Sequence, residues 1–231
     1  GMADATKALY KAEATVLKAF YYNLLWKFWG NVPYYDVNLT APYTAPQLKA
    51  DEVYENIVSR LEEVFEMDVL PMKAAAGNEG RVTKAMAYML YAETVMYQND
   101  ETRYGKALDC MDEIINSGQF SLVADFASIW EESGEWGPES IWEINYISEG
   151  AARSWGSPIH SGGSVYPMLS GVPGAPEASG YKGGWGFGPV AQSAWDMYAE
   201  DDIRRDGGIL NFYYEFPDLK LGEERWQYTG L

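Results

Sequence analysis

Apolar side chains recur at intervals of three and four residues along the first part of the chain, which is the period of an amphipathic helix. This pattern predicts a long helix from Thr6 to Gly30, where the glycine ends it. Asn31-Val-Pro then leads the chain away in extended form, because a residue before proline avoids the helical region. The apolar positions of this helix are Leu9, Ala12, Val16, Phe20, Leu24 and Phe28.

Three further helices follow a proline- and tyrosine-rich loop. Thr44 and Gln47 have the spacing of a capping box, which predicts that the second helix starts there. Glycines separate it from the third helix, and Gly118 ends the fourth. We expect the second helix to run from the capping box at Thr44–Gln47 to about Leu70, the third over about residues 82–98 and the fourth over about residues 104–117.

After Gly118 the pattern changes. Residues 141–146, IWEINY, alternate like a short strand. Residues 150–188 are rich in glycine, but aromatic residues are interleaved with the glycines. Because flexible linkers avoid aromatic residues, we expect ordered loops here, followed by a short helix at residues 190–199.

These elements predict a mainly α-helical protein. Residues 1–118 are expected to form a scaffold of tetratricopeptide-like helical hairpins, and residues 119–231 an irregular loop-rich region with short strands, packed on that scaffold. Tetratricopeptide hairpins place small and aromatic residues between their helices, and the residues at such places are Ala92, Tyr97, Tyr104 and Ala107.

Charge excludes some partners. The chain carries 17 Lys and Arg against 34 Asp and Glu, a net charge of −17. Nucleic acid and anionic membrane surfaces need a basic patch, so neither is an expected partner, whereas a neutral ligand is not repelled. Aromatic residues make up 15% of the chain, and those among the glycines are candidates for stacking on a ligand.

Few residues could support metal or thiol chemistry. The single cysteine, Cys110, lies in a helical apolar pattern, which indicates a buried and inert thiol. One histidine and one cysteine do not make a zinc site, and no glycine-rich phosphate loop joins a strand to a helix. We therefore expect no metal and no cofactor.

Acidic residues leave an enzymatic alternative open. A glycoside hydrolase needs two carboxyl groups about 5–9 Å apart, and tryptophan-rich loops over helices are common in such enzymes. The candidates are Glu131, Glu132, Glu135, Glu143 and Asp196. A second alternative is a tetratricopeptide-type scaffold that binds a protein in a concave helical groove.

Six segments in order resemble the SusD/RagB family of outer-membrane nutrient-binding proteins. They are AFYY (19–22) with FWGNVP (28–33), VYENIV (53–58), GRVTKA (80–85), YGKA (104–107) with IINSG (114–118), FSLV (120–123) and ESIWEI (139–144). The resemblance extends from about residue 5 to residue 206.

The resemblance implies a SusD-like fold and a non-catalytic, cell-surface protein that binds oligosaccharide for a TonB-dependent (SusC-like) outer-membrane transporter. It also implies that this chain is truncated at both ends, because family members are longer and carry a lipid anchor on an N-terminal cysteine. The membrane would be reached only through that anchor.

The ligand-binding residues are predicted from composition. Sugars present apolar C–H faces that stack on aromatic rings, and polar side chains bind their hydroxyl groups. The predicted stacking residues are Trp155, Tyr181, Trp185 and Phe187, and the predicted polar residues are Asn145, Arg153 and His160. For each of them, packing within the loops is the alternative role.

Overall fold

The computed structural model describes residues 1–146, 163–175, 179–180, 183–217 and 228–230. The chain divides into two compact units. The helical unit comprises Gly1–Ser121 and Pro138–Glu143, and the C-terminal unit comprises Leu122–Gly137 and Ile144–Leu231. Among the described residues, no helix combines the length and the apolar character needed to cross a membrane.

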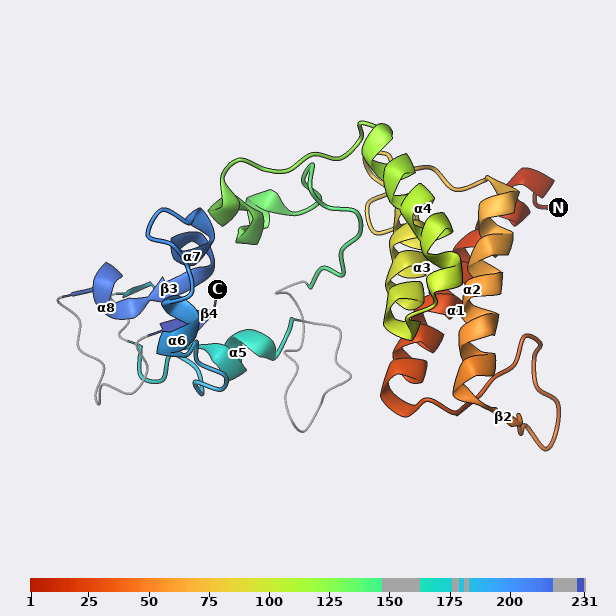
Figure 1. The fold of residues 1–231 in the computed structure, drawn as a ribbon, viewed down its shortest axis with the longest axis horizontal. Helices are drawn as coiled ribbons and strands as arrows, with labels where there is room; N and C mark the ends of the chain where they lie inside the picture. Colours follow the sequence, from red (N-terminus) through yellow and green to blue (C-terminus); the bar gives the residue numbers. More distant parts are fainter. Residues whose placement is uncertain (147–162, 176–178, 181–182, 218–227, 231) are drawn as a thin grey trace. The chain divides into compact units, whose positions relative to one another are not determined.

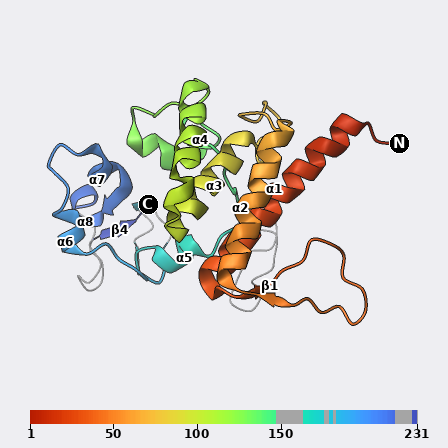
Figure 2. The ribbon, with the colours of Figure 1, turned by 45° about the vertical axis from the view of Figure 1, so that its right-hand side comes forward.

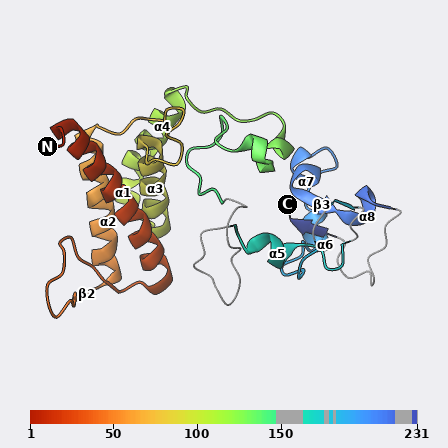
Figure 3. The same cartoon turned by 180° about the vertical axis from the view of Figure 1, so that it is seen from behind.

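Four long helices form the helical unit: α1 (Asp4–Trp29), α2 (Ala50–Met67), α3 (Lys84–Gln98) and α4 (Tyr104–Asn116). They lie side by side in chain order, with α1 against α2 and α3 against α4 (Figures 1 and 3). The N-terminal turns of α1 project beyond the other helices (Figure 2). The predicted set of helical hairpins is confirmed, with ends within a few residues of the expected positions for α1, α3 and α4.

The start of α2 differs from the prediction. Gln47 lies in a short strand, β2 (Gln47–Leu48), which pairs antiparallel with β1 (Val32–Pro33), so no capping box forms at Thr44. The helix begins at Ala50 instead, whose backbone N–H donates to the side chain of Asn31 at 2.9 Å. The predicted start was wrong because Gln47 and Leu48 pair with β1, and the helix is capped two residues later. Besides Asn31, Glu52 contributes to this cap, since its carboxylate accepts from the backbone N–H of Lys49 at 2.9 Å.

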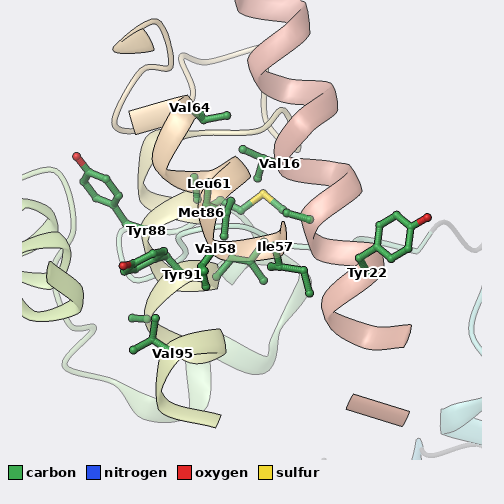
Figure 4. Close-up of a cluster of buried hydrophobic side chains, with 14 of the residues drawn as sticks. Val16, Tyr22, Ile57, Val58, Leu61, Val64, Met86, Tyr88, Tyr91 and Val95 are labelled. Atoms are coloured by element: carbon green, nitrogen blue, oxygen red, sulfur yellow. The ribbon is translucent and has the colours of Figure 1, made fainter. Parts of the chain in front are cut away.

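A single hydrophobic core joins α1, α2 and α3. Val16, Leu61 and Met86 come from these three helices and turn toward one another (Figure 4). Cys110 of α4 is also buried in this core, and burial raises the pKa of its thiol to about 11. The predicted burial of this thiol is confirmed, and its raised pKa disfavours the reactive thiolate at neutral pH.

Asp100 ties α2 to the turn between α3 and α4. Its carboxylate accepts hydrogen bonds from the hydroxyl of Thr102 at 2.5 Å, from Arg103 at 2.5 Å and from the hydroxyl of Tyr54 at 2.8 Å. Arg103 also pairs with Glu55 of α2 at 2.8 Å. The hydrogen bonds from Thr102, Arg103 and Tyr54 hold the pKa of Asp100 well below its ordinary value.

The predicted strand at residues 141–146 is not formed. Ile141 and Trp142 both pack against the core of the helical unit, so consecutive side chains face the same way instead of alternating. The Trp142 indole N–H donates to the carbonyl of Gly80 at 3.1 Å, and its ring meets Phe20 edge to face. Tertiary packing thus overrides the strand propensity of this segment.

Short elements make up the C-terminal unit. Strand β3 (Ile209–Asn211) pairs antiparallel with β4 (Tyr228–Gly230), and Leu210 lies with Val172 and Phe212 in a small core. The predicted helix at 190–199 is reduced to one turn, α6 (Gln192–Trp195). The remaining elements are η2 (Phe126–Trp130), η3 (Glu132–Gly134), α5 (Tyr166–Ser170), α6 (Gln192–Trp195), α7 (Ile203–Gly208) and α8 (Phe212–Glu215).

Replacing Leu61 by alanine tests the core. Leu61 is fully buried, and its truncation leaves a cavity, so we expect the free energy of unfolding to fall by about 2–5 kcal/mol in urea denaturation. Leu108→Ala on α4 is the control, because Leu108 is 61% exposed and its loss should change the free energy by less than about 0.5 kcal/mol. Equal effects of the two substitutions would contradict the assignment of the core.

Replacing Asp100 by asparagine tests the turn network. Since the folded pKa of Asp100 is lowered, its stabilisation is present above the unfolded value of about 3.9 and is lost as pH falls toward the folded value. We expect Asp100→Asn to unfold at lower urea than the wild type at about pH 7, and the difference to shrink at about pH 3. Asp112→Asn, at an exposed position of α4, should match the wild type at both pH values. A difference that does not change with pH would refute the proposed role of the carboxylate.

Candidate functional site

Three of the predicted site residues fall among the described residues. Trp185 is 46% exposed and Phe187 is 59% exposed, and Asn145 is exposed in the same unit. The other four, Trp155, Tyr181, Arg153 and His160, lie outside the described residues.

Trp185 and Phe187 lie on a segment without regular secondary structure that we term the aromatic ribbon, residues 184–188. The segment runs beside the C-terminal end of α5 and is held there by backbone hydrogen bonds. The N–H of Trp185 donates to the carbonyl of Met168 at 2.8 Å, and the N–H of Phe187 donates to that of Leu169 at 2.7 Å. Two more bonds run from Gly184 to Val172 at 3.2 Å and from Gly186 to Gly171 at 3.0 Å.

These hydrogen bonds provide partners for backbone carbonyls in the last turn of α5. The last carbonyls of a helix have no partner within the helix, and they need donors from elsewhere. Here the aromatic ribbon supplies the donors to Met168 and Leu169 of α5. The backbone of the ribbon is therefore fixed, while its two aromatic side chains stay exposed.

Two glycines of the aromatic ribbon adopt a backbone conformation that other residues rarely adopt. Gly186 and Gly188 have φ of 68°, in the left-handed region. They alternate with the aromatic residues, so the chain turns between one ring and the next. The glycines that alternate with aromatic residues in the sequence therefore allow the backbone to turn between the rings.

The two rings stand edge to face. Their centroids are 5.9 Å apart, and their planes meet at 86°. Such an arrangement presents two apolar faces in different directions, which suits ligands with apolar C–H faces. Burial of part of each ring limits its motion, so little conformational entropy is lost on binding.

One exposed aromatic residue of this neighbourhood was not selected from the sequence. Tyr166 begins α5, the helix that holds the aromatic ribbon, and is 72% exposed. It stands in the same glycine-rich stretch, so composition alone could have included it. Its helical position was not predictable, because α5 is only five residues long.

The candidate carboxylates of a hydrolase are spread over both units. Glu131, Glu132 and Glu135 are exposed near η3, and Glu131 accepts a hydrogen bond from Ser133 at 3.2 Å. Asp196 is exposed and accepts one from Gln192 at 2.8 Å, and Glu143 belongs to the helical unit. Within the part of the chain that the structure describes, no cluster of three or more acidic, histidine or cysteine residues could hold a metal ion.

The helical unit has an apolar face of its own. Tyr21, Leu24 and Phe28 follow one another along α1 at helical spacing and are exposed, as is Met89 of α3. The same unit has a cleft of about 230 Å³, lined by Phe20, Met86, Met89, Leu90, Glu93, Ile141 and Trp142. The hypothesis of a protein-binding scaffold predicted a hydrophobic surface of this kind on the helices.

The helical hairpins and the loop-rich C-terminal unit are the elements of a SusD-like fold. The chain is 44% identical to surface glycan-binding protein A from Bacteroides thetaiotaomicron, whose structure was solved in complex with laminarihexaose. The TM-score is 0.86, and the match covers 99% of this chain and 50% of that protein. The predicted SusD-like fold is confirmed.

Other SusD-like and surface glycan-binding proteins are also similar to this chain. Surface glycan-binding protein A from Bacteroides fluxus is 38% identical with a TM-score of 0.88, over 100% of this chain and 48% of that one. A SusD-like protein, P25, from Formosa agariphila is 24% identical over 146 residues, which are 60% of this chain and 26% of that protein. No family model matches the sequence. The chain spans about half the length of the solved structures that it matches here.

Proposed function

We propose that this chain binds an oligosaccharide without cleaving it, and that the aromatic ribbon is part of the binding surface. The observation that carries the proposal is the pair of exposed aromatic rings on a backbone fixed by four hydrogen bonds. A rigid aromatic surface stacks on the apolar faces of sugars, whereas linkers and packed loops do not expose such pairs in a fixed arrangement.

The relatives support the same class of ligand. The Bacteroides thetaiotaomicron protein is a surface glycan-binding protein solved with laminarihexaose, a neutral oligosaccharide. A neutral ligand also suits a chain with a net charge of −17, because it meets no electrostatic repulsion. We therefore take laminarihexaose as the first ligand to test.

We also propose different roles for the two regions of the chain. Residues 1–118 serve as the helical scaffold, and residues 119–231 carry the ligand site. Trp155, Tyr181, Arg153, His160 and Asn145 remain proposed ligand contacts in addition to Trp185 and Phe187. The whole protein would act at the cell surface, anchored by lipid to the outer membrane, and would deliver glycan to a TonB-dependent transporter.

Replacing Trp185 by alanine tests the site. We expect isothermal titration calorimetry with laminarihexaose to show saturable binding, and Trp185→Ala to raise the dissociation constant about tenfold, because one stacking face is lost. Trp29→Ala is the matched control, since Trp29 is an exposed tryptophan of α1 in the helical unit, and its loss should leave the constant unchanged.

Measurements on the same samples distinguish glycan binding from glycan hydrolysis and test whether the aromatic ribbon is part of the site. Reducing ends should not accumulate during the titration, and their release would replace the proposal by a glycoside hydrolase. An equal loss of affinity in both tryptophan variants would remove the aromatic ribbon from the site. Absence of binding to laminarihexaose and to a panel of other neutral oligosaccharides would refute the proposal for this chain.

A further inference from the structure

A hollow of about 370 Å³ lies between the first turns of α1 and the connection from α2 to α3, residues 68–83. Its volume is within the range of about 300–1,000 Å³ that is typical of small-molecule sites. All of its lining belongs to the helical unit, whereas the aromatic ribbon belongs to the C-terminal unit. The hollow is therefore a separate candidate site.

Backbone hydrogen bonds give the connection a defined shape. The N–H of Lys84 donates to the carbonyl of Pro71 at 2.8 Å, which closes the connection at its base. Two turns lie within it, because the N–H of Asn78 donates to Ala75 at 2.9 Å and the N–H of Arg81 donates to Asn78 at 3.2 Å. This wall of the hollow is preformed, so a ligand does not have to order it.

Arg81 joins the connection to α1 across the hollow. Its Nε and Nη2 donate to the two carboxylate oxygens of Glu13 at 2.9 and 2.7 Å. This pair uses two of the five N–H groups of a guanidinium and leaves the others for a ligand. The guanidinium also lies 5.5 Å from the centroid of the Tyr10 ring, and Tyr10 is 45% exposed.

The charged groups that line the hollow are two cations, Lys73 and Arg81, and one carboxylate, that of Glu13. Because Arg81 and Glu13 neutralise each other, Lys73 supplies a surplus positive charge. Its ammonium lies 4.8 Å from the centroid of the Phe120 ring and 3.5 Å from the carbonyl oxygen of Gln119, and neither group cancels that charge. Distant charges are screened over about 8 Å at physiological ionic strength, so the hollow favours an anionic group although the whole chain is acidic.

The rest of the lining is mainly apolar. Leu9 and Val82 present aliphatic surface, and the Tyr10 ring can pack against C–H groups. The side-chain amide of Asn78 can bind a hydroxyl group. A fitting ligand thus combines a carboxylate, hydroxyl groups and an apolar C–H face, and a sugar acid has all three.

We propose that this hollow is a second binding site, for a small sugar acid such as a hexuronate, whose carboxylate is held by Lys73 and Arg81 and whose ring packs against Tyr10. The site goes beyond the proposed function and does not depend on it, since it takes another class of ligand and lies in the other unit.

The test is a heteronuclear NMR titration of the chain with glucuronate and, separately, with glucose. The two sugars differ in one group, a carboxylate in place of a hydroxymethyl. We expect glucuronate to shift the amide signals of residues 71–82 saturably, and to bind at least about tenfold more tightly than glucose, because only the carboxylate makes charge-assisted hydrogen bonds.

Two lysine variants locate the site. Lys73→Gln should weaken glucuronate binding about tenfold and leave glucose binding unchanged. Lys11→Gln is the matched control, because Lys11 is exposed on α1 next to Tyr10 in the sequence and does not line the hollow. It removes the same charge and should leave glucuronate binding unchanged.

A third variant, Arg81→Lys, keeps the charge and removes the planar fork. We expect it to weaken glucuronate binding roughly three- to tenfold. Thermal unfolding of every variant verifies that it is folded before its affinity is compared.

Several outcomes would overturn the second site. They are equal affinity for the two sugars, equal effects of Lys73→Gln and Lys11→Gln, and no saturable shift with glucuronate or with its epimer galacturonate. Trp185→Ala, which tests the proposed function, should leave glucuronate binding unchanged. Failure of this inference and failure of the proposed function are therefore distinguishable.

Discussion

The candidate site depends on one constraint, which is that the carbonyls at the end of α5 need hydrogen-bond donors. A five-residue helix has little stability of its own, and its last carbonyls cannot be satisfied within it. The aromatic ribbon supplies donors to Met168 and Leu169 and is fixed by the same bonds. Helix and ribbon therefore stabilise each other, and the exposed rings of Trp185 and Phe187 are held in a defined arrangement without being buried.

The helical unit is built by a different principle. Its hydrophobic core joins α1, α2 and α3, and polar side chains then connect the ends of the helices, as Asp100 does between α2 and the turn before α4. Burial of large apolar side chains provides most of the stability of such a unit, and the polar contacts at its surface add smaller amounts. A well-packed scaffold of this kind supports ligand-binding loops in many folds.

Periodicity in the sequence was sufficient to predict the four long helices, because each helix has an apolar face repeated over several turns. The SusD-like fold was predicted from the resemblance of six ordered segments to that family. Prediction was wrong where distant residues decide the local structure. Asn31 caps α2 from nineteen residues away, and the contact of Trp142 with Gly80 keeps residues 141–146 out of a strand. At the site, the composition identified Trp185 and Phe187 as candidates, but neither the angle between their rings nor the backbone bonds from the ribbon to α5 could be obtained from a pattern of residue types.

The most direct test of this account is a crystal structure of the 231-residue chain soaked with laminarihexaose. The account predicts sugar rings stacked on Trp185 and Phe187, with the backbone bonds from the ribbon to α5 unchanged. A glycan bound elsewhere, with both rings uncovered, would contradict it. A glycan held with its linkage between two carboxylates would contradict it too, and would point to catalysis instead.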